Sequence, residues 1–395
     1  MQWLGKVEKL LDQKKLAEWQ RWLHQHAERS FEETETAGYI RGVLSTFDNL
    51  EITRPTPTSV IAALKGARPG PVIGLRADID ALPLEEQADT EHKSINKGMM
   101  HACGHDSHAA MLLGAAHVLS QMKGSLHGGV KFIFQHAEEY PPGGAKEIMD
   151  TGLLDDVCCF YANHVSPNEP VGAVGSDSGP RTAAVDSIFL NVTGKGGHGA
   201  MPHLTIDPIV VGCEIVSNLN NIVARNVSPL NNVVISMGKF TSGTVNNIIP
   251  QTAELHATVR TTTPETRGFI EGRVRSVIDG ICKAYGAEYA LSYVKGYAPV
   301  INDERCVAIV RKVAAYVLGE GGCKATEKSL GGEDFSAYLD KAPGALVEIF
   351  SGSGDGNYNY SLHHPKFIVN PGALPIGAKM YIGYALESLQ AFEWS

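Results

Sequence analysis

The first part of the chain, to about residue 180, alternates short apolar runs with segments of helical periodicity. The apolar runs are "PVIGLRA", "GGVKFIFQ" and "VCCFYANHV", and the helical segments between them are "SHAAMLLGAAHVLSQM" and "GGAKEIMDTGLL". Continuous apolar strands separated by helices are typical of a largely parallel sheet that is buried on both faces. Helical periodicity also runs from about Trp3 to Leu44, where Ser30 and Glu33 in "SFEETETAGYIRGVL" form a Ser-x-x-Glu signal for a helix start. The sequence therefore predicts an α/β fold.

The order of the predicted elements changes near Arg181. The order becomes strand, helix, strand, strand, helix, strand, over 187–194, 207–225, 231–240, 252–260, 264–286 and 289–297. This β-α-β-β-α-β order is that of a ferredoxin-like domain. A chain of 395 residues is also too long for one ordinary core. We therefore expect a ferredoxin-like domain over 182–294, inserted in an α/β domain formed by 1–181 and 295–395.

Composition argues against several classes of partner. The chain has 43 acidic and 34 basic residues, a formal charge of -9, and no run of Lys or Arg, so we expect no nucleic-acid partner. No stretch approaches the roughly 20 apolar residues that cross a bilayer, so we expect no membrane partner. Seven scattered cysteines are typical of reduced thiols, which favours a cytoplasmic protein.

Polar clusters follow the apolar runs of the predicted α/β domain. They are Asp78 and Asp80; His136, Glu138 and Glu139; His164; His363 and His364; and, before a helix, Cys103 and His105. Each has an ordinary explanation when taken alone, because a lone Cys is usually a small buried hydrophobe and a Glu pair is usually a solvated surface. Ligands of an open α/β sheet, however, bind at the carboxyl ends of its strands. Separate segments that bring His, Cys and Glu to that edge favour a metal site.

The types of donor atom restrict which metals the site can bind and which reaction it can catalyse. One thiolate with imidazoles and carboxylates suits zinc, manganese, cobalt or nickel, whereas calcium and magnesium prefer oxygen ligands. Two adjacent glutamates beside such donors indicate that one binds metal and the other transfers protons. A pair of metal ions can lower the pKa of water to about 7 and polarise a carbonyl. The predicted chemistry is hydrolysis of an amide-like bond.

Seven motifs occur in order across nearly the whole chain: "GLRADIDALPLEE", "MHACGHDSHAAML", "QHAEE", "GKGGHGAMPH", "NNIIP", "GGEDFSAYL" and "LHHPKF". Together they resemble the amidohydrolase branch of the dinuclear metallopeptidases related to aminoacylase and carboxypeptidase G. That branch includes hippurate hydrolases, N-acyl-amino-acid deacetylases and plant auxin-conjugate hydrolases. The resemblance implies a metal-bearing α/β domain with an inserted lid domain that also forms a homodimer.

The resemblance also implies roles for residues of the α/β domain. The residues implied to bind two divalent metal ions are Cys103, His105, Glu139, His164 and His363. Glu138 is implied to be the general base and acid, and Asp80 to orient a ligand. Asp78 stands where the wider clan has a ligating histidine, as this branch expects. We further expect Asp106 to cap the helix that follows and His108 only to line the site.

Three residues of the predicted lid are implied to contact substrate. His198 in "GKGGHGAMP" is implied to reach the partner subunit's active site and stabilise the oxyanion, although taken alone it is an ordinary histidine of a Gly-rich loop. Asn247 and Arg260 are implied to hold the substrate carboxylate, for which a planar guanidinium is well suited. Two departures, "HAERS" for His-Pro-Glu-Leu-Ser and His136 for a proline, remove no ligand and bear on substrate preference.

We predict a metal-dependent amidohydrolase that deacylates N-acyl amino acids through a metal-activated water, with Glu138 as general base and acid. A dipeptidase or carboxypeptidase with the same site is the first alternative. A non-catalytic metal-dependent binding protein on the same fold is the second. The complete ligand set and the intact Glu138 favour an enzyme that acts on a small N-acyl amino acid or peptide.

Overall fold

The computed structural model describes residues 3–391, and the chain forms two compact units. The first unit contains the chain up to Gly179, then Ile301–Glu327, and then the chain from Asp334 onward. The second unit contains Pro180–Val300 and Lys328–Glu333. Within 3–391, no helix combines the length and the hydrophobicity that a bilayer crossing requires.

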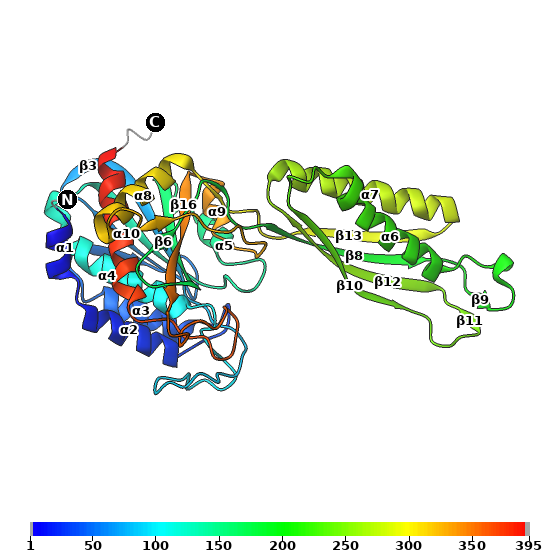
Figure 1. The fold of residues 1–395 in the computed structure, drawn as a ribbon, viewed down its shortest axis with the longest axis horizontal. Helices are drawn as coiled ribbons and strands as arrows, with labels where there is room; N and C mark the ends of the chain where they lie inside the picture. The colour runs from blue at the N-terminus through cyan, green and yellow to red at the C-terminus, as the bar shows by residue number, and fades with distance from the viewer. Residues whose placement is uncertain (1–2, 392–395) are drawn as a thin grey trace. The chain divides into compact units, whose positions relative to one another are not determined.

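The first unit is a sheet covered by helices (Figure 1). Its helices are α1 (Leu4–Leu10), α2 (Gln13–Gln25), α3 (Thr34–Leu44), α4 (His105–Gln121), α5 (Ala145–Asp150), α8 (Glu304–Leu318), α9 (Ser336–Leu339) and α10 (Ala373–Ala391). The strands of its large sheet are β1 (Leu50–Thr53), β2 (Val60–Lys65), β3 (Arg68–Asp78), β4 (His127–Gln135), β5 (Val157–Pro170), β6 (Val174–Gly175), β15 (Cys323–Lys324) and β16 (Gly344–Gly352). Two further short strands are β7 (Gly179–Pro180) and β14 (Ile301–Asn302).

The large sheet has a parallel centre and antiparallel flanks. Its strand order is β1-β2-β4-β3-β5-β16-β6-β15, and the central strands β4, β3, β5 and β16 run parallel. The pairs β1–β2, β2–β4 and β16–β6 are antiparallel. The apolar runs predicted to be parallel strands form this centre as β3, β4 and β5, and the antiparallel flanks come from strands for which no prediction was made. Only residues 54–59 join β1 to β2, and a connection this short returns the chain in the opposite direction.

Helix α4 is buried along nearly its whole length. It contacts β3, β4 and β5 on one side and α2, α3 and α10 on others. Small and apolar residues on all sides of the helix suit a position without a solvent-exposed face. Gly114 allows α2 to approach closely, because a Cβ there would lie 2.5 Å from Cδ2 of Leu16. This packing fixes the helix whose first residues belong to the candidate site.

A helix follows the predicted Ser-x-x-Glu signal, but neither Ser30 nor Glu33 caps it with its side chain, so that part of the prediction is wrong. Helix α3 begins later, at Thr34. Two N–H groups of its first turn donate to the carboxylate of Glu28, at 2.8 and 3.1 Å, so another residue performs the capping. The side chains of Ser30 and Glu33 instead bind residues beside the candidate site.

The second unit has its own sheet and its own core. Its main elements are β8 (Ala184–Thr193), α6 (Pro208–Asn226), β10 (Val233–Ser242), β12 (Thr252–Thr261), α7 (Pro264–Tyr285) and β13 (Glu288–Lys295). The four strands are antiparallel in the order β10-β12-β8-β13. Alternate residues of β12 are buried, and both helices contact this strand. A short pair, β9 (Gly197–His198) and β11 (Ile248–Ile249), lies outside the sheet.

Candidate metal centre

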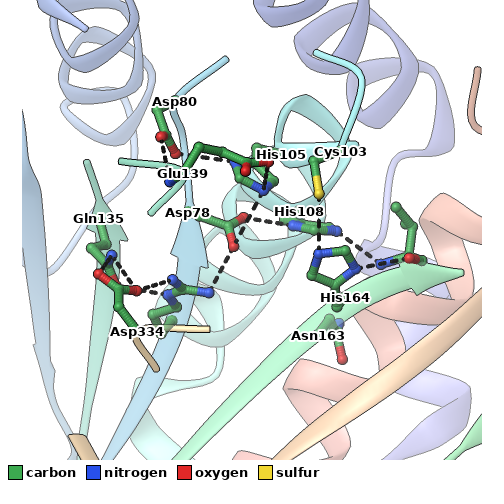
Figure 2. A network of polar contacts seen from close by, with 12 residues as sticks. Asp78, Asp80, Cys103, His105, His108, Gln135, Glu139, Asn163, His164 and Asp334 are labelled. Atoms are coloured by element: carbon green, nitrogen blue, oxygen red, sulfur yellow. Dashed lines mark hydrogen bonds and ion pairs between the residues drawn. The ribbon is translucent and has the colours of Figure 1, made fainter. Parts of the chain in front are cut away.

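The carboxyl ends of neighbouring parallel strands and the start of α4 meet at one edge of the large sheet (Figure 2). The residues of this edge are Asp78 and Asp80 at the end of β3, Glu138 and Glu139 after β4, His164 in β5, Cys103 and His105 at the start of α4, and His363 between β16 and α10. The structure thus brings together side chains that the strand-end pattern predicts to be neighbours.

Cys103 lies in the middle of this group. Its Sγ is 3.5 Å from Nε2 of His164 and 3.4 Å from Nε2 of His363. His363 Nε2 is in turn 3.1 Å from Oε1 of Glu139. Two sets of three donors therefore share the sulfur, one with His105 and His164 and the other with Glu139 and His363, each with its donor atoms within 4.8 Å of one another. Two sets that share one donor match two neighbouring cations.

Nε2 of His105 is a candidate donor atom that lacks a hydrogen-bond partner. Nε2 of His105 is buried and unpartnered, 3.7 Å from Oδ2 of Asp78 and 3.9 Å from Oε1 of Glu139. Leaving a buried polar atom unpaired is costly. A cation among these atoms would satisfy it, and imidazole, thiolate and carboxylate are the ligands that zinc and related metals take. The residues present fit the metal ions that the resemblance implies.

Two pKa shifts show which charge the site favours. Burial alone would lower the pKa of His105, but Asp78 and Asp80 outweigh burial and raise it to about 10. Burial, followed by the charges of Glu139 and Glu138, raises the pKa of the Cys103 thiol well above its usual range. The carboxylates thus stabilise a positive charge, and Cys103 becomes a thiolate only when a cation compensates.

Asp80 fixes the orientation of His105. Its Oδ1 lies 3.1 Å from Nδ1 of His105, which leaves Nε2 of that ring facing the site. Its Oδ2 accepts the backbone N–H of Glu139 at 2.9 Å and the hydroxyl of Ser30 at 2.7 Å. Burial would raise the pKa of Asp80, but these contacts hold it below its usual range. One ionised carboxylate therefore positions both the side chain of one candidate ligand, His105, and the backbone of a second, Glu139.

His108 and Arg76 both contact Asp78 and so hold its carboxylate in place at the site. Nδ1 of His108 is 2.6 Å from Oδ1 of Asp78, and its Nε2 accepts the N–H of Val165 at 2.8 Å, so both ring nitrogens are used. The fully buried Arg76 donates to Asp78 at 2.7 Å and to Asp334 at 2.9 Å. Sequence reasoning missed Arg76. The available signal was an arginine inside a strand that is otherwise apolar.

Asp106 does not cap α4, which corrects the expectation from the sequence. The residue before the helix is Gly104, with φ 84° and no side-chain cap. The Asp106 carboxylate instead contacts His24 at 2.9 Å and accepts from Gln20 at 2.6 Å, so it ties the start of α4 to α2. Burial opposes the charge of His24, but Asp106 and Glu86 raise its pKa to about 10.

Glu138 lies beside the candidate ligands. Its side chain is 7% exposed, and a carboxylate oxygen is within 4.8 Å of donor atoms of His105 and Glu139. Glu138 is a member of neither set that shares Cys103. A buried carboxylate next to the donors but outside both sets is suited to proton transfer.

The three predicted lid residues do not meet within one chain. His198 and Asn247 are exposed and adjacent, because β9 pairs with β11 and the N–H of Gly199 donates to the carbonyl of Asn247 at 2.9 Å. Arg260 lies at the opposite end of β12, whose start follows β11. At 3.3–3.4 Å per residue, Arg260 is about 27 Å from Thr252 at the start of the strand. One substrate carboxylate cannot contact Asn247 and Arg260 of the same chain.

A family model described as Peptidase family M20/M25/M40 matches residues 74–387. The chain belongs to this family. The matched range contains every candidate ligand, together with Glu138. Membership of a peptidase family makes the protein a hydrolase of amide bonds.

Individual relatives cover most of the chain. An N-acyl-L-amino acid amidohydrolase of Geobacillus stearothermophilus is 45% identical over 299 residues, 75% of this chain and 80% of the relative. Thermostable carboxypeptidase 2 of Saccharolobus solfataricus is 36% identical over 390 residues, 96% of this chain and 98% of the relative. A solved Bacillus subtilis structure, described as a dinuclear metal-binding peptidase of the M20 family, has a TM-score of 0.85 and 35% identity, covering 96% of this chain and 99% of that chain.

Proposed function

We propose that this protein hydrolyses the amide bond of N-acyl amino acids and releases the free amino acid. The observation that carries the proposal is the pair of Cys/His/Glu sets that share Cys103, with the buried carboxylate of Glu138 beside them. The similarity to an N-acyl-L-amino acid amidohydrolase supports this substrate class.

The proposed cofactor is a pair of divalent ions, zinc, manganese, cobalt or nickel. The residues proposed to hold them are Cys103, His105, Glu139, His164 and His363. The two donor sets and the similarity to a structure described as dinuclear support two ions. Bound ions of this kind acidify water and polarise the carbonyl oxygen of the substrate.

Glu138 is the proposed proton carrier. It takes a proton from the attacking water as the oxygen bonds to the carbonyl carbon, and it passes that proton to the amide nitrogen as the C–N bond breaks. The amine then leaves as a neutral group. Asp80 keeps His105 and the backbone of Glu139 in place throughout, since it contacts both.

The proposed lid is a ferredoxin-like domain over 182–294, inserted between 1–181 and 295–395, that pairs two chains into a homodimer. The strand and helix order of the second unit and its separate core support this assignment. Asn247 lies before the start of β12 and Arg260 near its end, and this separation supports a shared site. In such a site Arg260 holds the substrate carboxylate, while His198 and Asn247 of the partner subunit reach the oxyanion and the substrate.

We also propose a cytoplasmic location. All seven cysteines are free thiols, which is the state of cysteine in a reducing compartment.

Amine release from a panel of substrates tests the proposed function. The panel contains N-acetyl, N-benzoyl and longer-chain N-acyl amino acids together with dipeptides. Each is assayed before and after metal removal, with add-back of zinc, manganese, cobalt or nickel. Release from N-acyl amino acids that a chelator abolishes and one metal restores is the expected result.

Two other outcomes would contradict the proposal. Cleavage of dipeptides alone would make the protein a peptidase, the alternative that the similarity to thermostable carboxypeptidase 2 favours. Silence across the panel with every metal, from folded protein, would favour a metal-dependent binding protein.

A further inference from the structure

The side chains of Ser30 and Glu33 do not cap α3 but contact residues at the candidate site. The Ser30 hydroxyl donates to Oδ2 of Asp80 at 2.7 Å. Glu33 is fully buried, and its Oε1 accepts the backbone N–H of Ala137 at 2.8 Å. The same oxygen accepts the N–H of Phe31 at 3.0 Å. Since Glu28 caps α3, the buried carboxylate of Glu33 is available for these other contacts.

The segment 30–33 holds the backbone on both sides of Glu138. Glu33 binds the N–H of the preceding residue, Ala137, directly. Asp80 binds the N–H of the following residue, Glu139, at 2.9 Å, and Ser30 in turn binds Asp80. The proposed proton carrier therefore lies between two backbone positions that are each held by a carboxylate oxygen.

The Glu33 contacts maintain an unfavourable backbone conformation. Ala137 has φ 52° and Phe31 has φ 69°, and both are non-glycine residues in the left-handed region. This conformation costs about 1–3 kcal/mol for each residue and persists only where the surroundings enforce it. Hydrogen bonds from both N–H groups to one oxygen of the Glu33 carboxyl group supply that enforcement, because a buried N–H that loses its acceptor is costly. Without them, Ala137 can relax and turn Glu138 away.

We propose that Glu33 is a positioning residue for Glu138: its buried carboxyl oxygen holds Ala137 in the left-handed conformation and so aims the Glu138 side chain at the candidate metal centre. The inference rests on the role proposed above for Glu138. A misplacement of about 1 Å at a catalytic group can cost about 100-fold in rate, so a contact one residue away can control turnover.

The reach of the Glu33 side chain matters more than its charge. Burial, followed by the charge of Asp80, raises the pKa of Glu33 to about 7. The carboxyl group is therefore partly protonated near neutral pH, and an uncharged carbonyl oxygen must still serve as the acceptor. A glutamine offers such an oxygen at the same distance, whereas an aspartate keeps the charge but shortens the side chain by one methylene.

The test compares Glu33→Gln, Glu33→Asp and Glu33→Ala, with Glu32→Ala as an exposed neighbouring control. We expect Glu33→Gln to keep kcat within about threefold of the natural protein. Glu33→Asp and Glu33→Ala should lower kcat about 10- to 100-fold with little change in KM, and Glu32→Ala should change neither. Metal content, measured on each variant, should stay unchanged.

A second readout does not depend on activity. Hydrogen exchange at the Ala137 amide should accelerate in Glu33→Asp and Glu33→Ala and stay slow in Glu33→Gln, because only the glutamine retains the acceptor. Hydrogen exchange still tests the backbone contact even when the natural protein cleaves no substrate. Absence of cleavage would contradict the proposed function but not the contact between Glu33 and Ala137.

Three results would overturn the inference. One is a folded, metal-loaded Glu33→Asp variant with full kcat and slow exchange at Ala137. Another is a Glu33→Gln variant as impaired as Glu33→Asp, which would assign the effect to charge. The third is a parallel loss of kcat and thermal stability in all three Glu33 variants. If Glu33→Ala does not fold, the comparison of Gln with Asp alone decides.

Discussion

The candidate metal ligands of the first unit and the candidate substrate contacts of the second unit are held in opposite ways. His105 is buried, and its orientation is fixed by Asp80 before any ligand binds. His198 and Asn247 are exposed on a pair of two-residue strands. A metal centre must be rigid in advance, whereas a group that contacts only substrate or a partner chain can stay exposed until both are present. One chain is therefore enough to fix the geometry of the candidate metal ligands. The candidate substrate contacts are expected to reach their working positions only when substrate or a second chain is bound.

The largest expected effect on kcat comes from a buried residue of the first unit, Glu138. Glu138→Ala should lower kcat by about 10³- to 10⁴-fold, because the water then lacks its proton acceptor. Metal content and thermal stability should stay unchanged, since Glu138 belongs to neither donor set that shares Cys103. Steady-state kinetics and metal analysis of the same preparation check the prediction. A variant within tenfold of the natural rate would mean that another group is the base.

His198→Ala tests the exposed candidate substrate contacts of the second unit. We expect kcat to fall about 10²- to 10³-fold, the usual cost of losing one donor to the oxyanion. The melting temperature and metal content should be unchanged, because His198 is exposed and lies outside the candidate metal centre.

Mixing His198→Ala with Glu138→Ala tests the shared site. Half of randomly paired dimers are mixed and each contains one intact site, so about a quarter of the natural activity should return. A failure to recover activity after verified subunit exchange would show that His198 acts within its own chain.

Asp80→Asn should have a smaller effect that is specific to metal binding. An amide nitrogen in place of Oδ2 cannot accept the N–H of Glu139, and the rotated amide cannot accept from His105. We expect metal affinity to fall about 10- to 100-fold, measured by competition with a chelating dye. Full activity at saturating metal would agree with an orienting role. Unchanged affinity would contradict it.

The smallest expected effect concerns the link between α2 and α4. The folded pKa of His24, about 10, is above its ordinary value of 6.5. Its contribution to stability is therefore complete below pH 6.5 and is lost as the pH rises through about 10.

His24→Gln should accordingly lower the free energy of unfolding by roughly 1–3 kcal/mol at pH 6, and the difference should shrink towards pH 10. Urea unfolding at pH 6, 8 and 10 measures this, with the exposed His127→Gln as a control. A difference that does not change with pH would mean that His24 is uncharged in the folded protein.

Local patterns in the sequence predicted which side chains meet at one edge of the large sheet, and the structure brings those side chains together. The strand ends could be located because short continuous apolar runs differ from the longer runs of helical periodicity, and polar residues that end parallel strands must meet at one edge. The same reasoning overlooked Arg76 and assigned Asp106 to a helix cap. Both residues have partners far away in the chain, Asp334 for Arg76 and His24 for Asp106.

The sequence by itself determined which residue types occupy the strand ends, and hence the candidate donors and the type of chemistry. Only the tertiary structure decided which carboxylate orients which group. Ser30 and Asp80 are 50 positions apart, and Glu33 and Ala137 are 104 apart. A short motif predicts only the local backbone, and by that criterion Ser30 and Glu33 have the pattern of a helix start. Burial brings distant polar groups into contact, and because an unpaired buried group is costly, these contacts replace the local ones.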